Sequence, residues 1–148
     1  MLPRLLPLVL LGALAACDCD EDYSEPLPRL AAIEVETYDP VTNLVWENMG
    51  VRIISAYQEW AGQEFRNPAP VWFLTGPTGR VYLDMQRLAE ARVGFQEDAD
   101  GNALLRAGPT EDQAWVLLEI GAQGFTSVFA EVELAWYAPQ RFVSVPIR

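Results

Sequence analysis

Hydrophobic and polar residues alternate with a period of two along most of the chain after residue 30. Ile33 and Val35, for example, alternate with Glu34 and Glu36. This pattern is typical of a strand that buries one face and exposes the other. We therefore expect strands at 33–38, 51–60, 71–74, 80–85, 103–105, 114–120, 126–136 and 141–147.

The segment 86–95 fits either a short helix or a strand. We favour a strand, because the Asp-Ala-Asp-Gly-Asn sequence at 98–102 is typical of a hairpin turn, with 103–105 as the returning strand. Seven to nine short strands without a long helical pattern predict an all-β fold, a single antiparallel β-sandwich of transthyretin-like or immunoglobulin-like type. The aromatic residues expected in its core are Trp72, Trp115 and Phe129.

The first 16 residues have a different pattern, with Arg4, an apolar run over 5–14 and two alanines. This is the layout of a secretory signal, and the apolar run is shorter than the roughly 20 residues that a membrane-spanning helix needs. The sequence Leu14-Ala15-Ala16-Cys17 resembles the lipobox of bacterial lipoproteins. The resemblance implies that residues 1–16 are removed, that Cys17 carries the lipid, and that the protein belongs to the bacterial cell envelope.

An acidic segment with two prolines follows over 17–29, and we expect it to be a flexible tether in front of a domain at 30–148. Asp18 stands directly after the cysteine. In some enterobacterial lipoproteins an aspartate at this position favours retention at the inner membrane, which makes Asp18 a candidate sorting residue. The sequence leaves open the periplasmic face of either membrane and the cell surface.

Three turn-rich motifs resemble those of carboxypeptidase-regulatory-like domains, which have the transthyretin-like sandwich. Residues 38–53 are similar to the family's D-x-x-T-G-x-P-x-x-G-V-x-V pattern, which joins the first two strands. Residues 75–83 are similar to its T-D-x-x-G-x-F-x-F turn and strand, and 121–125 to its A-x-G-Y step before the final strands. The resemblance implies an accessory or adhesive module without chemistry of its own, with 86–113 as an inserted hairpin or extended loop.

The composition restricts the chemistry, because the chain has no histidine and no lysine. Histidine-activated nucleophiles, Schiff-base and P-loop lysines, and zinc sites built from His and Cys are therefore excluded. Cys19 is the only cysteine besides Cys17, so no internal disulfide is expected once Cys17 carries lipid. We predict a protein that is not an enzyme and that needs no cofactor.

The mature protein is strongly acidic. Removal of the leader with Arg4 leaves nine arginines against 21 acidic residues, which gives a net charge of −12. Such a charge argues against nucleic acid as a partner, and against adhesion to anionic lipid other than through the acyl anchor.

The loop at 98–102 is also a candidate calcium site, because Asp98, Asp100 and Asn102 place oxygen atoms at alternate positions around Gly101. In an EF-hand alignment the two end ligands would be Gln96 and Ala107, so both are missing. We therefore interpret the loop as a turn and predict no metal site.

Four aromatic residues are candidates for a binding surface: Trp46, Trp60, Trp136 and Tyr137. They stand in predicted loops or at strand ends, and aromatic residues with acidic or amide neighbours can form a protein-docking or sugar-stacking face. We expect an accessory or structural subunit of an envelope assembly, with an envelope protein as partner. The alternative is a carbohydrate-binding envelope module that uses these aromatic residues. The sequence fixes neither the partner nor the oligomeric state.

The lipobox hypothesis predicts that Cys17→Ser moves the protein from the membrane fraction to the soluble envelope fraction, because the acyl anchor is lost. Fractionation followed by immunoblotting of the mutant and the wild type measures this. Continued membrane attachment of Cys17→Ser would contradict the hypothesis, and Cys19→Ser serves as the matched control that should stay attached.

Overall fold

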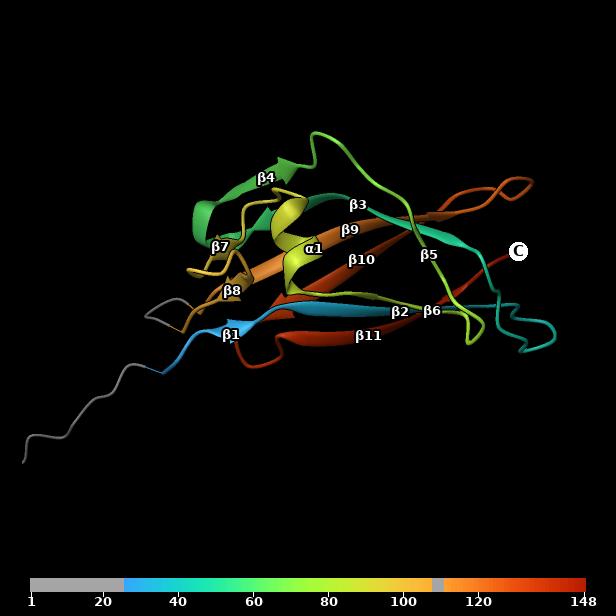
Figure 1. Ribbon diagram of the computed structural model, residues 1–148, viewed down its shortest axis with the longest axis horizontal. Helices are drawn as coiled ribbons and strands as arrows, with labels where there is room; N and C mark the ends of the chain where they lie inside the picture. Colours follow the sequence, from blue (N-terminus) through green and yellow to red (C-terminus); the bar gives the residue numbers. More distant parts are fainter. Residues whose placement is uncertain (1–25, 108–110) are drawn as a thin grey trace, which may run out of the picture.

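A computed structural model describes residues 26–107 and 111–148, so the leader, Cys17 and Asp18 lie outside the described residues. The described chain forms eleven strands and two short helices (Figure 1). The helices are α1 (Met85–Glu90) and the 3-10 helix η1 (Glu59–Ala61). The strands are β1 (Arg29–Leu30), β2 (Ala32–Tyr38), β3 (Gly50–Gln58), β4 (Gln63–Arg66), β5 (Phe73–Leu74), β6 (Arg80–Leu83), β7 (Gln96–Glu97), β8 (Ala103–Leu105), β9 (Gln113–Gly121), β10 (Val128–Ala135) and β11 (Gln140–Pro146).

The strands form three sheets of five, three and three strands, and all three contribute residues to one hydrophobic core. The five-stranded sheet has the order β10-β9-β3-β4, with β5 paired to the start of β3, and the second sheet has the order β11-β2-β6. The third sheet, β1-β8-β7, lies at the end of the domain where the described chain begins (Figure 1). Ile33 of β2, Ile53 of β3 and Leu118 of β9 are fully buried in the common core. The predicted β-rich fold is therefore confirmed, but with more strands and more sheets than expected.

The prediction of an antiparallel arrangement was wrong for one pair of strands, because β11 runs parallel to β2 over its whole length. The reason lies in the order of chain reversals. β10 runs antiparallel to β9, and the chain reverses again before β11. β2 has the same direction as β9 and β11, so the first and last long strands are parallel. All other strand pairs of the described residues are antiparallel.

The preference for a strand at 86–95 was also wrong, because α1 covers Met85–Glu90. Asp84 caps this helix, since its Oδ1 accepts a hydrogen bond of 3.0 Å from the backbone N–H of Arg87. Leu88 and Ala89 are buried and join the common core. The segment expected as an insertion, of which 86–107 and 111–113 are described, thus contains most of a helix, the β7–β8 hairpin and the first residue of β9. None of the helices in the described ranges is long and apolar enough to cross a bilayer.

The first strand of the described chain, β1, pairs Arg29 with Leu105 of β8. The prediction of core aromatic residues needs a correction. Trp72 and Phe129 are 42% and 60% exposed, and Trp115 points away from the core on β9. Aliphatic residues fill the core instead, which leaves these aromatic side chains available at the surface.

A small set of hydrogen bonds joins the loop after β2 to the turn before β6. The hydroxyls of Thr37 and Thr75 both donate to the carbonyl of Trp46 at 2.9 Å. The Thr75 hydroxyl also accepts the backbone N–H of Met49 at 3.0 Å, and the N–H of Thr37 donates to the Gly79 carbonyl at 2.9 Å. The turn at 75–79 is therefore held by hydrogen bonds to the end of β2 and to residues 46–49. An atom added to this turn would disturb those contacts.

Gly79 is the residue of this turn with the least space. It has φ +70°, and a Cβ at this position would stand 2.6 Å from Val45 Cβ and 2.9 Å from the Thr37 carbonyl oxygen. Gly101 has a similar φ of +76° but nothing within 4 Å of such a Cβ. We expect Gly79→Ala to lower the free energy of unfolding by about 3 kcal/mol and Gly101→Ala by about 1 kcal/mol, since only the first adds steric overlap to backbone strain. Urea unfolding of both variants measures the difference, and equal losses would contradict this account.

Candidate functional site

The solvent face of the five-stranded sheet carries apolar side chains where alternation predicts polar ones. Tyr57 on β3 stands opposite Trp115 on β9, with ring centroids 5.8 Å apart and planes tilted by 48°. Leu117 is the next residue on the same side of β9. We call Tyr57, Trp115 and Leu117 the aromatic face. Single apolar residues at a surface are ordinary, but a cluster on one sheet face indicates contact with another molecule.

Acidic residues stand beside each member of the aromatic face. Glu64 on β4 is opposite Tyr57, and on β10 Glu133 is opposite Trp115 and Glu131 opposite Leu117. A partner that covered the apolar centre would therefore meet carboxylates on two sides of it. Such a surface favours a partner with a positively charged border.

A groove crosses the same sheet at its other end, where Gly50 of β3 and Gly121 of β9 stand opposite each other. Both glycines are buried, because side chains of neighbouring segments lie over them. A Cβ on Gly50 would lie 2.8 Å from Cε3 of Trp72, and one on Gly121 would lie 3.0 Å from Oγ of Ser127. The groove has a volume of about 430 Å³ and is lined by Asn48, Gly50, Trp72, Leu74, Gly121, Ala122, Gln123 and Ser127.

The indole of Trp72 is held by a charged pair on the sheet. The guanidinium carbon of Arg52 lies 4.3 Å from the centre of its ring, which is a cation–π distance. Nε and Nη2 of Arg52 donate to one oxygen of Glu119 at 2.9 and 2.7 Å. Trp72, Arg52 and Glu119 thus form a row across the strands, with Phe129 beyond Glu119 on β10.

The environment of Glu119 favours its ionised form. Hydrogen bonds from Arg52, together with one from the Ser127 side chain and the charge of Arg52, hold the pKa of the Glu119 carboxyl below its usual value, although partial burial acts in the opposite direction. The side chain of Glu119 is only 13% exposed and that of Arg52 30%. The pair is therefore shielded enough to fix the position of the Arg52 guanidinium against the Trp72 ring.

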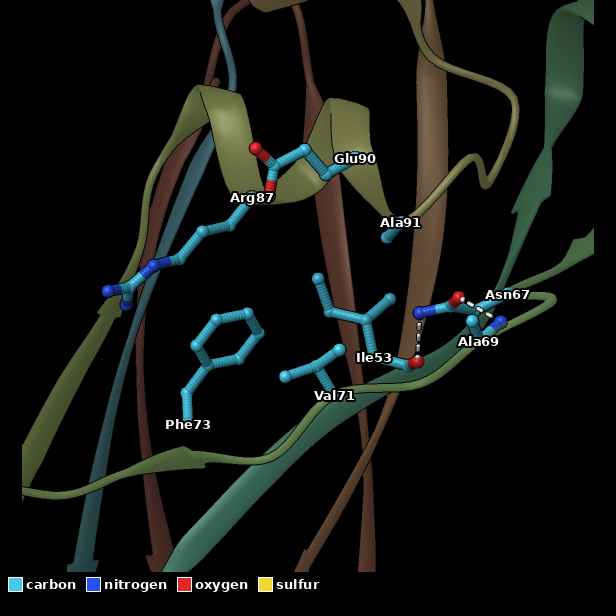
Figure 2. A pocket seen from close by; sticks show the side chains of 8 residues that line it. All are labelled: Ile53, Asn67, Ala69, Val71, Phe73, Arg87, Glu90 and Ala91. Carbon is cyan, nitrogen blue, oxygen red and sulfur yellow. Dashed lines mark hydrogen bonds between the residues drawn. The ribbon is translucent and has the colours of Figure 1, made fainter.

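A second hollow lies between α1 and the segment before β5 (Figure 2). Figure 2 shows Ile53, Val71 and Phe73 around it, with Arg87 of α1 lying 4.5 Å from the ring centre of Phe73. Its volume is only about 50 Å³. Ligand sites have volumes of roughly 300–1,000 Å³, so this hollow is too small for an organic ligand.

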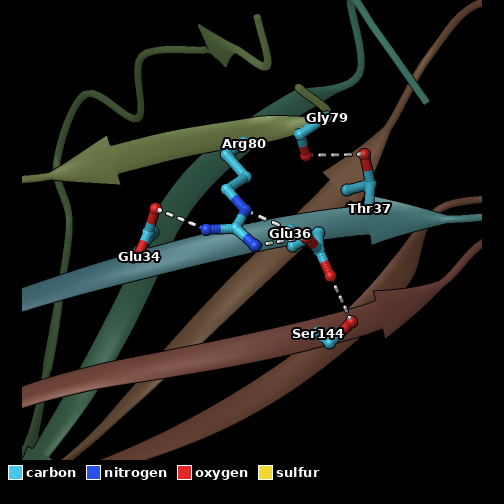
Figure 3. A network of polar contacts seen from close by, with 6 residues as sticks. All are labelled: Glu34, Glu36, Thr37, Gly79, Arg80 and Ser144. Atoms are coloured by element: carbon cyan, nitrogen blue, oxygen red, sulfur yellow. Dashed lines mark hydrogen bonds and ion pairs between the residues drawn. The ribbon is translucent and has the colours of Figure 1, made fainter. Parts of the chain in front are cut away.

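The solvent face of the β11-β2-β6 sheet combines a charged network (Figure 3) with the exposed rings of Tyr82 and Phe142. Arg80 donates to Glu36 at 2.9 Å and lies 3.6 Å from Glu34, and the Ser144 hydroxyl donates to Glu36 at 3.1 Å. Glu36 and Glu34 raise the pKa of the Arg80 guanidinium above its usual value. Because these groups satisfy one another, this face differs from the aromatic face in its chemistry.

The four aromatic residues predicted from sequence do not lie together. Trp46 belongs to the end of the domain where β2 and β9 finish, and it packs edge to face on Phe125 with centroids 5.3 Å apart. Trp60 lies in η1, at the opposite end, and is 44% exposed. Trp136 and Tyr137 follow β10 at this opposite end, where the N–H of Trp136 donates to the Asp112 carbonyl at 3.1 Å.

Trp136 holds the start of the described chain. Its Nε1 donates to the Leu27 carbonyl at 3.0 Å, and the guanidinium of Arg29 lies 4.4 Å from its ring centre. The hydroxyl of Tyr137 donates to Glu133 at 3.3 Å and its side chain is 55% exposed. The indole of Trp136 is thus occupied by the domain's own N-terminal segment.

Asp98 shapes the β7–β8 turn. One carboxylate oxygen accepts the N–H groups of Asp100 and Asn102 at 2.9 Å, and the other accepts the side-chain amide of Asn102 at 2.9 Å. These bonds, led by the Asn102 side chain, hold the pKa of the Asp98 carboxyl below its usual value. The carboxylate is therefore occupied within its own turn. In the part of the chain that is described, no three His, Cys, Asp or Glu side chains are close enough to hold a metal ion.

Sequence reasoning did not identify Trp72, Gly50 or Gln123 as site residues. Trp72 stands in an apolar run, Val71-Trp72-Phe73-Leu74, that is typical of a core strand. The missed signals were Pro68 and Pro70 just before this run, which favour an irregular segment over a central strand.

The Arg52–Glu119 pair gives a test of this geometry. Because the folded-state pKa of Glu119 lies below its unfolded value, its contribution is present above the usual glutamate pKa and is lost as pH falls through the folded pKa. We expect Glu119→Gln to lower the free energy of unfolding at pH 7 by about 1 kcal/mol, and this difference from wild type to shrink below about pH 4.5. Urea unfolding at pH 7 and pH 3.5 measures it, with the exposed Glu131→Gln as control. A pH-independent loss would show that the Glu119 charge is not involved.

Comparison of the chain with known protein families, with curated proteins and with solved structures gives no significant match.

Proposed function

We propose that this chain is a lipid-anchored protein of the bacterial cell envelope whose β domain is a non-catalytic interaction module. It acts as an accessory or structural subunit of an envelope or surface assembly and binds an envelope protein. The observation that carries this proposal is the aromatic face, where Tyr57, Trp115 and Leu117 occupy solvent-side positions of the sheet. Tyr57 is 43% exposed, whereas Trp115 and Leu117 are half-buried, so a partner that covered this cluster would complete its burial.

The lipid anchor in this proposal rests on the sequence alone. The run Leu14-Ala15-Ala16-Cys17 follows a secretory leader, and Cys17 is the residue that would carry the acyl chains. A stable anchor needs more than one chain, and each buried methylene contributes about 0.8 kcal/mol. The absence of histidine and lysine from the sequence supports the non-catalytic part of the proposal.

We also propose that the domain is a transthyretin-like sandwich of the carboxypeptidase-regulatory-like type. The three motifs support this, because 39–43 lies in the β2–β3 loop, 75–79 leads into β6, and 121–125 precedes β10 and β11. The strand order favours this type over the immunoglobulin alternative. An immunoglobulin domain places its first two strands in the same sheet, whereas β2 and β3 belong to different sheets.

The chemistry of the aromatic face restricts the partner. A flat apolar centre between Glu64 on one side and Glu131 and Glu133 on the other fits a protein surface with an apolar centre and arginine or lysine at its border. Aromatic residues at the centre of a patch are the type that contributes most to binding energy.

Tyr57→Glu is expected to abolish recovery of the partner, because it places a carboxylate in the apolar centre. The measurement is affinity purification of the lipidated protein from detergent-solubilised envelope, with mass spectrometry of proteins recovered in stoichiometric amount. Tyr82→Glu is the matched control, since Tyr82 is 47% exposed on the opposite sheet and Tyr57 is 43% exposed. Partner recovery should fall at least about tenfold for Tyr57→Glu and stay unchanged for Tyr82→Glu.

Equal recovery with both variants would overturn the aromatic face as the docking surface. If the wild type retained no protein in stoichiometric amount, the proposed accessory role would fail. The melting temperature of each variant is measured alongside, and Trp115→Arg replaces Tyr57→Glu if the latter does not fold.

A further inference from the structure

The groove between Trp72 and the loop after β9 has two chemically different walls. On one side stand the apolar side chains of Trp72 and Leu74, which are 42% and 61% exposed. On the other side stand polar groups, the amide of Gln123 and the hydroxyl of Ser127, and the amide of Asn48 also lines the groove. The ligand that fits must therefore combine an apolar surface with several hydrogen-bonding groups.

We propose that this groove binds a neutral glycan. A sugar ring carries C–H groups on its faces and hydroxyls around its edge, which matches one apolar wall and one polar wall. In this arrangement the ring contacts Trp72 and Leu74, and its hydroxyls bond to Asn48, Gln123 and Ser127. The volume of about 430 Å³ lies within the usual range for small-ligand sites.

The shape of the groove depends on Gly50 and Gly121. They face each other across the β3–β9 ladder and are both buried, with Trp72 over Gly50 and Ser127 against Gly121. A Cβ on Gly50 would already stand 2.8 Å from the indole of Trp72. The two glycines therefore allow Trp72 and Ser127 to lie close against the sheet, which sets the positions of both walls of the groove.

The apolar wall is held in place before a ligand arrives. Arg52 lies against the Trp72 ring at 4.3 Å, and Glu119 fixes Arg52 through two hydrogen bonds. A fixed indole loses little conformational entropy on binding, which increases affinity for a weakly binding ligand such as a sugar.

Charge decides which glycans fit. The Arg52 guanidinium is already paired with Glu119, so the groove offers no free cation among its described residues. The mature chain has a net charge of −12. An anionic polysaccharide would be repelled by this field, whereas a neutral glycan would not.

The groove is separate from the docking surface of the proposed function. Gly121 is the last residue of β9, whereas Trp115 stands six residues earlier on the same strand, at a distance of about 20 Å. A substitution in one site should therefore leave the other site unchanged. The glycan proposal does not depend on the identity of the protein partner.

The test is calorimetric titration of the full lipidated protein in a detergent without a sugar headgroup. The probes are neutral β-1,4-linked tetramers of glucose and of N-acetylglucosamine, with a tetramer of galacturonate as the charged comparison. We expect wild type to bind at least one neutral tetramer more tightly than the galacturonate. Trp72→Ala should weaken that binding at least about tenfold, and Gln123→Ala about threefold.

Trp60→Ala is the matched control, because Trp60 is 44% exposed at the opposite end of the domain. Unchanged binding in Trp60→Ala and loss in Trp72→Ala supports the proposal. Equal binding in both, or no binding of either neutral tetramer by wild type, overturns it. If Trp72→Ala unfolds, Gln123→Ala and Leu74→Ala decide, since both side chains line the groove.

The two proposals fail in distinguishable ways. Tyr57→Glu should keep glycan binding while losing the protein partner, and Trp72→Ala should do the reverse. If wild type bound no tetramer and Trp72→Ala lost the protein partner, the groove would belong to a protein interface and the glycan proposal would be wrong.

Discussion

The pairing of β2 with β11 is the contact on which the closure of the domain depends. It joins the first and last long strands over seven residue pairs, from Ala32 and Gln140 to Tyr38 and Pro146. Because everything between them in sequence must fold back for this ladder to form, its loop-closure entropy is large. The common core offsets that entropy, since Ile33 and Val35 of β2 and Val145 of β11 are buried in it. The β2–β11 ladder thus helps to position the five-stranded sheet, although neither β2 nor β11 belongs to that sheet.

The two sheets differ in the side chains that they present to solvent. On the β11-β2-β6 sheet, Arg80, Glu34, Glu36 and Ser144 form a polar network, and the exposed rings of Tyr82 and Phe142 lie on the same face. The five-stranded sheet has an apolar middle at the aromatic face, and a groove lined by Trp72 where Gly50 and Gly121 oppose each other. Both proposed contacts lie on the five-stranded sheet.

The long strands could be predicted because each buries one face, so apolar and polar residues alternate in segments such as 33–38 and 114–120. The α1 helix could not, since a six-residue helix depends on the Asp84 cap and on burial of Leu88 against distant strands. The site was missed for a related reason. Trp72 looks like a core residue locally, and its exposure follows from the glycine at position 50 and from Arg52, which only the β3–β5 pairing brings beside it.

The hydrogen bond from Trp136 to Leu27 fixes where the N-terminal segment leaves the domain. This point lies beside the start of β9, and the groove lies at its end, about 26 Å away along the strand. A molecule attached to the chain ahead of Leu27 would therefore be held at the end of the domain farthest from the groove, and the length of β9 would separate it from any occupant of the groove.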